Sequence, residues 1–230
     1  VVFTRNASES LNLVAQTLGR SVLHEGDEVV VSIMEHHSNI IPWQQVCAQT
    51  GARLVYLRLD DDFRITQEEL EAKVGPKAKI VSVTQVSNVL GVQNDIPAIS
   101  ARAHQMGAHM VVDGAQSVPH LKVDVRELGC DLLAFSAHKM GGPMGIGVLW
   151  GKTALLDQMP PFLTGGEMID SVSETDAVWA PVPQKFEAGT QDAAGSYAFD
   201  AGLGYLESMG FAALEARERL LSAYLTESLA

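Results

Sequence analysis

Cysteine, basic residues and long apolar runs are all scarce in this 230-residue chain. Its two cysteines, Cys47 and Cys130, cannot build a disulfide framework, and without a CxxC spacing they do not indicate a metal site. Lys and Arg number 16 against 28 Asp and Glu, and the net charge of −12 disfavours nucleic acid and anionic membranes as partners. No apolar run approaches the roughly 18 residues that cross a bilayer, and no signal peptide is evident. We therefore expect a cytoplasmic location.

Both ends of the sequence interrupt a regular pattern. The chain opens in an apolar run, Val1–Phe3, without an initiator Met, and it closes inside a helical pattern that starts at Phe211. We interpret residues 1–230 as one large domain, truncated at both ends of a longer protein.

Short runs rich in Val and Ile alternate with helical patterns. Runs typical of buried parallel strands lie at residues 29–33, 53–59, 79–83, 109–112, 131–135 and 146–150. Helices are expected after Asn6, where Asn6 or Ser8 would be the cap, and at 44–49, 66–74, 98–106, 193–209 and 211–229. Irregular connections are expected between residues 151 and 192. This alternation predicts an α/β fold with a mostly parallel sheet and flanking helices.

Polar residues follow four of the expected strands. These segments are Glu35–Asn39, Thr84–Asn88, Asp113–Gln116 and Ser136–Lys139. In an open parallel sheet, ligands bind beyond the carboxyl ends of the strands. We therefore expect a binding site built from these four segments.

Lys139 and Asp113 follow successive strands and suggest one chemistry together. Alone, Lys139 could be an ordinary loop lysine and Asp113 the start of a turn. As a pair, they match the way proteins hold pyridoxal phosphate, with an Asp at the ring nitrogen and a Lys at the aldehyde. Burial would favour this role for Lys139, because burial lowers the pKa of a lysine and makes its amine nucleophilic.

The phosphate of such a cofactor needs hydrogen-bond donors. Asn6-Ala7-Ser8 lies at an expected helix N-terminus, which favours anions, and Ser136 and His138 flank Lys139. The adjacent His36 and His37 could stack on a ring or bind a metal. Since no acidic or cysteine cluster accompanies them, we expect no metal site.

At this point the motifs resemble a known family. Val112–Gln116 and Phe135–Pro143 resemble the class V aminotransferase group of fold-type I pyridoxal-phosphate enzymes. Glu35–Gln44, Val86–Gly91 and Phe186–Thr190 are similar to group II cysteine desulfurases and selenocysteine lyases, which serve iron–sulfur cluster assembly. The resemblance implies the cofactor-binding large domain of such a transferase.

For the reacting end of the cofactor, the resemblance implies five residues. Lys139 would bind the aldehyde carbon covalently and move the α-proton of the substrate. Asp113 would pair with the ring nitrogen, and His36 would stack on the ring. Gln116 would hydrogen-bond the phenolic oxygen, and Asn88 would hold the substrate carboxylate or the ring edge.

For the phosphate, the resemblance implies the backbone amides of Ala7 and Ser8 and the side chains of Ser8, Ser136 and His138. Thr190 would reach the phosphate of the second subunit in a homodimer. The substrate would be L-cysteine or L-selenocysteine, converted to L-alanine, and the sulfur would leave as a persulfide for a sulfur-acceptor protein.

The sequence departs from the family pattern in several places. Asn6-Ala7-Ser8 replaces Gly-Thr-Thr, Ala137 replaces a common Gly, and Gln191-Asp192 replaces Pro-Asn. The sulfur-accepting cysteine and a carboxylate-binding arginine of the family belong to a C-terminal small domain, which this sequence does not reach. Neither Cys47 nor Cys130 is expected to replace that cysteine.

Three alternatives remain open. A different class V aminotransferase or a kynureninase-like hydrolase would use the same cofactor. A non-catalytic pyridoxal-phosphate-binding fragment would need no nucleophile. A nucleotide-binding α/β domain is the third, although Gly145-Ile146-Gly147 precedes an expected strand, whereas a nucleotide fingerprint follows one.

Overall fold

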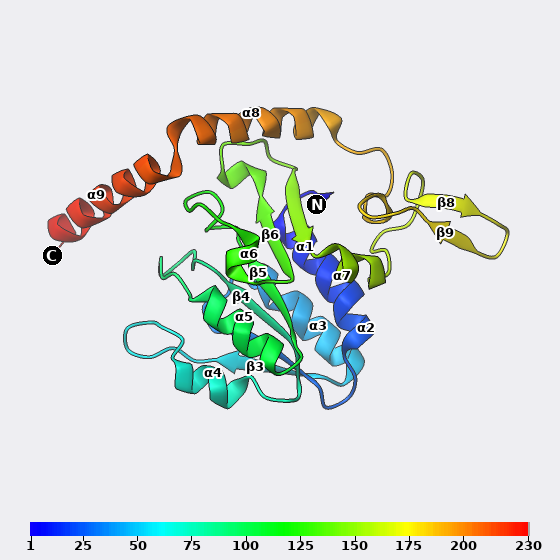
Figure 1. The fold of residues 1–230 in the computed structure, drawn as a ribbon, viewed down its shortest axis with the longest axis horizontal. Helices are drawn as coiled ribbons and strands as arrows, with labels where there is room; N and C mark the ends of the chain where they lie inside the picture. The colour runs from blue at the N-terminus through cyan, green and yellow to red at the C-terminus, as the bar shows by residue number, and fades with distance from the viewer. Residues whose placement is uncertain (230) are drawn as a thin grey trace.

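A seven-stranded sheet forms the centre of the structure, a computed structural model that describes residues 1–229 (Figure 1). The strand order is β1-β7-β6-β5-β4-β2-β3. The strands are β1 (Val2–Thr4), β2 (Glu28–Ser32), β3 (Arg53–Leu57), β4 (Ala78–Thr84), β5 (His109–Asp113), β6 (Leu132–Ser136) and β7 (Gly147–Gly151). Strands β2 to β6 are mutually parallel, which confirms the predicted mostly parallel sheet.

The prediction that residues 146–150 form a parallel strand is wrong. Strand β7 runs antiparallel to β6, with Ser136 opposite Gly147 and Leu132 opposite Gly151. Only a 3₁₀ turn and a short loop join the two strands, whereas a parallel pair needs a crossover of a dozen or more residues. The unpredicted strand β1 then pairs antiparallel with β7 and closes that edge of the sheet.

Helices cover both faces of the sheet. One layer holds α1 (Ala7–Val14), the π-helical segment Ala15–Gly19, α2 (Arg20–Val22), α3 (Ile41–Thr50) and α7 (Thr153–Gln158). The other layer holds α4 (Gln67–Lys73), α5 (Ile96–Gln105) and α6 (Val125–Leu128). Successive residues of β2 show the division, because Val29 and Val31 pack in the first layer and Val30 in the second. Both faces are therefore apolar, as expected for parallel strands.

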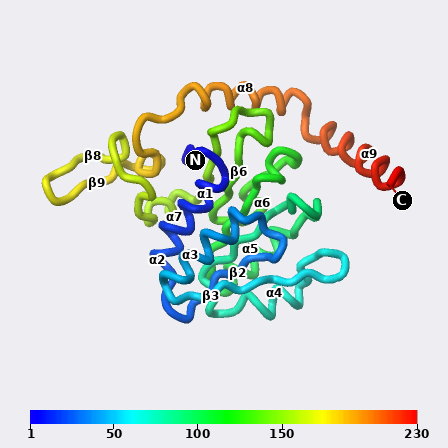
Figure 2. The backbone as a smooth tube through the Cα atoms, turned by 180° about the vertical axis from the view of Figure 1, so that it is seen from behind, coloured from blue at the N-terminus to red at the C-terminus, as the bar shows by residue number. Residues whose placement is uncertain are grey.

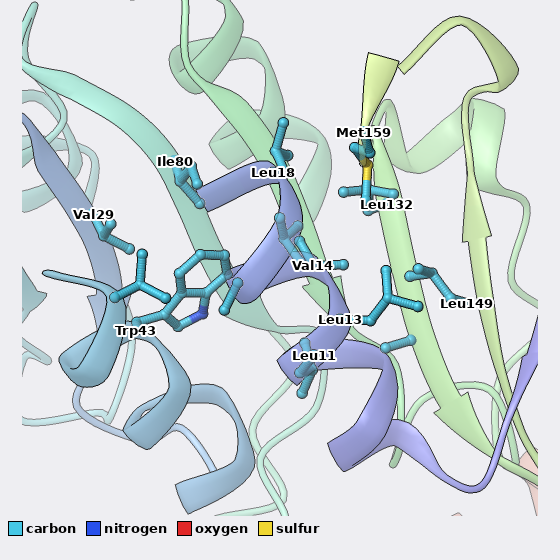
Figure 3. Close-up of a cluster of buried hydrophobic side chains, with 14 of the residues drawn as sticks. Leu11, Leu13, Val14, Leu18, Val29, Trp43, Ile80, Leu132, Leu149 and Met159 are labelled. Carbon is cyan, nitrogen blue, oxygen red and sulfur yellow. The ribbon is translucent and has the colours of Figure 1, made fainter. Parts of the chain in front are cut away.

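Trp43 anchors the first layer. Its side chain is fully buried and lies between β2 and α1, near Val29 and Leu11 (Figure 3). Gly19 permits this packing, because a Cβ there would lie 3.2 Å from the indole. The indole nitrogen donates to Asn39 Oδ1 at 3.0 Å. Trp43 thus fixes both α3 and the loop that precedes it.

The last part of the chain departs from the sheet. Helix α8 (Ala193–Met209) crosses one side of the domain, and α9 (Phe211–Leu229) continues away from it (Figure 2). Between residues 151 and 192, where irregular connections are predicted, the structure has α7 and the hairpin β8 (Ile169–Val172) and β9 (Ala177–Trp179). Within residues 1–229, every helix is too short or too polar to serve as a membrane span.

Helix α8 packs directly on the loop after β6. Phe199 and Leu206 join a cluster with Ala137, Met140 and Val148. Gly202 faces the backbone of the glycines after Met140, because a Cβ at Gly202 would lie 3.1 Å from the carbonyl of Gly141. The loop and the helix are therefore in backbone contact.

Gly147 brings β7 against the start of α1. A Cβ at this position would overlap the backbone of Asn6 and would lie 2.6 Å from its carbonyl carbon. Only glycine therefore allows the sheet to support the first turn of α1 at this distance.

We predict that Gly147→Ala lowers the free energy of unfolding by roughly 1–3 kcal/mol, because backbone must move to admit the methyl group. Urea denaturation followed by circular dichroism measures the change. Gly204→Ala is the matched control: its Cβ would meet nothing within 4 Å, and alanine favours the helix. Equal stability of Gly147→Ala and the parent chain would contradict the close contact.

Candidate functional site

A cavity of about 260 Å³ opens at the carboxyl edge of the parallel strands. Its lining comes from the start of α1 and from the segments after β2, β4, β5 and β6: Asn6, Ala7, Ser8, His36, Ser38, Thr84, Val86, Asn88, Asp113, Ala115, Gln116, Ser136, His138 and Lys139. The structure therefore brings together every predicted site residue except Thr190. Thr190 lines a separate cavity of about 350 Å³, beside Arg5 and Asp192.

Asp113 ends β5 inside this cavity and is 4% exposed. Burial raises the pKa of its carboxyl, and the Ala115 N–H and the charges of Lys139 and His36 oppose that rise. Its Oδ1 accepts a hydrogen bond from Ala115 N at 2.9 Å, and within residues 1–229 it forms no ion pair. A buried carboxylate needs donors or a cation, so Asp113 is suited to a protonated ring nitrogen.

Lys139 ends the 3₁₀ turn Ala137–Lys139 that follows β6. Its side chain is exposed, whereas burial would have favoured the expected role. The backbone around it is well fixed: Gly142 N donates to Ala137 O at 3.0 Å, and a Cβ on Gly142 would lie 2.7 Å from the ring of Phe199. The amine thus extends from a rigid loop into an accessible site.

The start of α1 presents Ala7 and Ser8 to the cavity, and we name this pair the anion-binding cradle for the role expected of it. Asn6, not Ser8, is the helix cap, because its Oδ1 accepts from Glu9 N at 3.0 Å. Ser136 Oγ accepts from Ala7 N at 2.8 Å, and within residues 1–229 Ser8 N has no hydrogen-bond partner. A free amide and a hydroxyl at a helix N-terminus are suited to a phosphate.

Only the first histidine of the pair lines the cavity. His36 lies beside Asn88 in the lining, whereas His37 belongs to a 3₁₀ turn, His37–Asn39, and lines neighbouring grooves. The two rings are 5.9 Å apart and inclined by 39°.

Sequence reasoning missed a buried network beneath the cavity. Glu35 is 6% exposed and accepts three hydrogen bonds. Thr84 N donates to its carboxyl at 2.9 Å and Asn39 Nδ2 at 2.7 Å, and Ser32 Oγ donates the third hydrogen bond. Burial raises the pKa of Glu35 to about 8, and the three donors only partly offset that rise.

The network extends through Asn39. Its Oδ1 accepts from Trp43 Nε1 at 3.0 Å and from Ser82 Oγ at 2.6 Å. The sequence signal was the position of Glu35 and Asn39 in a polar segment after a buried strand. Periodicity does not distinguish which residues of such a segment turn inward.

Both thiols are buried away from the cavity. Cys47 lies on α3, in the first layer, and Cys130 precedes β6 at the end remote from the cavity. Burial raises the pKa of each to about 11. Since the thiolate is the nucleophile, neither cysteine is activated.

Comparisons with known proteins point to one family. The family model for aminotransferase class-V matches residues 1–230. A probable cysteine desulfurase of Halalkalibacterium halodurans is 51% identical over 229 residues, covering 100% of this chain and 56% of the relative. A cysteine desulfurase of Haloferax volcanii is 46% identical over 229 residues, covering 100% and 54%.

Among solved structures, the cysteine desulfurase CsdA of Escherichia coli superimposes with a TM-score of 0.97 at 40% identity. The match covers 99% of this chain and 57% of CsdA. The chain thus spans about half the length of the relatives it matches.

The raised pKa of Glu35 predicts that the stability of the chain depends on pH. The folded chain holds its proton more tightly than the unfolded chain, where the carboxyl has its ordinary pKa of 4.5. The contribution of Glu35 to the free energy of unfolding should therefore fall as pH rises from about 4.5 to about 8, by up to about 1.4 kcal/mol per pH unit.

Urea denaturation at several pH values measures this slope. Glu35→Gln should make it less negative than in the parent chain, whereas Glu68→Gln, at an exposed carboxyl of α4, should leave it unchanged. The same slope in Glu35→Gln and in the parent chain would contradict a proton held at this site.

Proposed function

This chain belongs to the class-V aminotransferase family, and from that premise we propose that it is the pyridoxal-phosphate-binding large domain of a cysteine desulfurase. The enzyme would convert L-cysteine to L-alanine and pass the sulfur on as a persulfide. One observation carries the proposal: Asp113, Lys139 and the start of α1 line the same cavity. The names of the relatives at 46–51% identity support the choice of reaction.

The cavity offers a matching group for each part of pyridoxal phosphate. The buried Asp113 carboxylate, which has no ion-pair partner within residues 1–229, suits the ring nitrogen. The free amide of Ser8 at the start of α1 suits the phosphate. The exposed amine of Lys139 suits the aldehyde. We therefore regard the residues as fitting this cofactor.

When bound, pyridoxal phosphate supplies an electron sink for charge that develops at the α-carbon of an amino acid. Asp113 would keep a proton on the ring nitrogen, since its carboxylate is a better acceptor in a dry site than in water. Lys139 Nζ would hold the aldehyde carbon and then carry the α-proton of the substrate. His36 would cover one face of the ring.

The remaining residues would orient the ligand. Gln116 would donate to the phenolic oxygen, and Asn88 would hold the substrate carboxylate or the ring edge. Ser136 and His138 would join Ala7 and Ser8 around the phosphate, as donors that carry no substrate specificity.

Thr190 would serve a different subunit. It lines a separate cavity, and the family resemblance implies that it would reach the phosphate of a second copy in a homodimer. The proposal has four further parts. The sulfur would pass to a sulfur-acceptor protein and serve iron–sulfur cluster assembly. L-selenocysteine would be an alternative substrate, and the location would be cytoplasmic.

Lys139 provides the direct test of the proposal. Reconstitution with pyridoxal phosphate should give a visible absorption band that borohydride removes. The reduction should leave a pyridoxyl label on the peptide that contains Lys139. Lys139→Ala should abolish the trapped label and keep the far-ultraviolet circular dichroism of the parent. Lys122→Ala, at an exposed lysine outside the cavity lining, should label normally. Undiminished trapping in Lys139→Ala would overturn the assignment.

We also predict that neither cysteine of this chain accepts the sulfur. Both thiols should react slowly with a thiol reagent in the folded chain and fully in urea, because burial raises the pKa of each to about 11. With no thiol in this chain to accept the sulfur, alanine and sulfide release from cysteine should stay at the level of free pyridoxal phosphate, both in the parent chain and in a Cys47→Ala/Cys130→Ala double variant. Turnover that disappears in the folded double variant would show that one of them is the nucleophile.

A further inference from the structure

His36 is held by a residue to which the proposed function assigns no role. Ser38 N donates to His36 Nδ1 at 3.2 Å, and Ser38 Oγ lies 3.0 Å from the same nitrogen. A backbone N–H can only donate, so Nδ1 must accept. The neutral ring therefore carries its proton on Nε2.

Ser38 also reaches the anion-binding cradle. Its Oγ lies 2.5 Å from Ser8 Oγ, on the first turn of α1. The Ser38 hydroxyl thus stands between the cradle and the imidazole, and all three side chains line the same cavity.

We propose that Ser38 is a positioning residue, which sets the tautomer of His36 and connects the ring to the anion-binding cradle. The inference rests on the proposed function only in taking the cradle as a phosphate site. Nε2 is then the one ring nitrogen available to another molecule, because the lone pair of Nδ1 already accepts from Ser38.

The hydroxyl protons allow two arrangements. With the cradle empty, Ser8 donates to Ser38, and Ser38 donates to His36 Nδ1. An anion has only acceptors, so a bound phosphate draws the Ser8 proton toward itself. Ser38 then donates to Ser8, and Nδ1 keeps only the backbone N–H. Phosphate binding therefore removes one hydrogen bond from Nδ1, and Nδ1 still accepts from the Ser38 N–H.

Nitrogen-15 spectra of the imidazoles test the first part, on the chain without pyridoxal phosphate. At alkaline pH, His36 should show an unprotonated Nδ1 and a protonated Nε2. Ser38→Ala should lower the ratio of Nε2–H to Nδ1–H rings about fivefold, the equivalent of one neutral hydrogen bond, and Ser38→Thr should restore it. A predominant Nδ1–H ring in the parent chain, or an unchanged ratio in a folded Ser38→Ala variant, would overturn the proposal.

Inorganic phosphate tests the connection. Its addition should move the Nδ1 resonance of the parent chain, and the movement should be lost in Ser38→Ala and in Ser8→Ala. Ser8→Ala should keep the parent tautomer, since the contacts of Ser38 with Nδ1 remain. A movement equal to that of the parent in both variants would refute the hydroxyl bridge. Because no measurement uses pyridoxal phosphate, failure of the proposed cofactor would leave these results standing, and the reverse also holds.

Discussion

The carboxyl of Glu35 joins the segments on which the cavity is built. Its three hydrogen bonds come from Ser32 on β2, Asn39 in the following turn and Thr84 on β4. All three donors are neutral and buried, so displacing any one of these segments leaves a polar group unpaired at a cost of about 1–3 kcal/mol. Residues 36–38 lie between Glu35 and Asn39, so the hydrogen bonds of the Glu35 carboxyl hold the backbone at both ends of this segment.

The two residues proposed to act on the cofactor have opposite environments. Asp113 is held inside the sheet edge by strand pairing, whereas Lys139 extends from a loop whose backbone is fixed and whose side chain is free. Burial suits an acid that must keep one geometry, and exposure suits an amine that must be reached by a ligand. The same sheet edge therefore supplies both a buried and an exposed group.

Much of the fold follows from patterns within single segments. The strands of β2, β4, β5 and β6 and the polar residues after them could be predicted, because apolar runs and turn residues are local signals. The direction of β7 could not, since it depends on how its partner and connection pack. The inward turn of Glu35, the capping of α1 by Asn6 rather than Ser8 and the separate cavity of Thr190 depend on tertiary contacts in the same way. The roles of the cavity residues remain predictions.

The contact between α8 and the Lys139 loop has a mechanical consequence. Gly202 meets Gly141 and Gly142 backbone to backbone, and the ring of Phe199 packs on Gly142, so the helix and the loop are in direct contact. With 17 residues, α8 is about 25 Å long, and Gly202 lies near its middle. A tilt imposed at its far end, where α9 begins, would therefore press on the backbone that carries the amine.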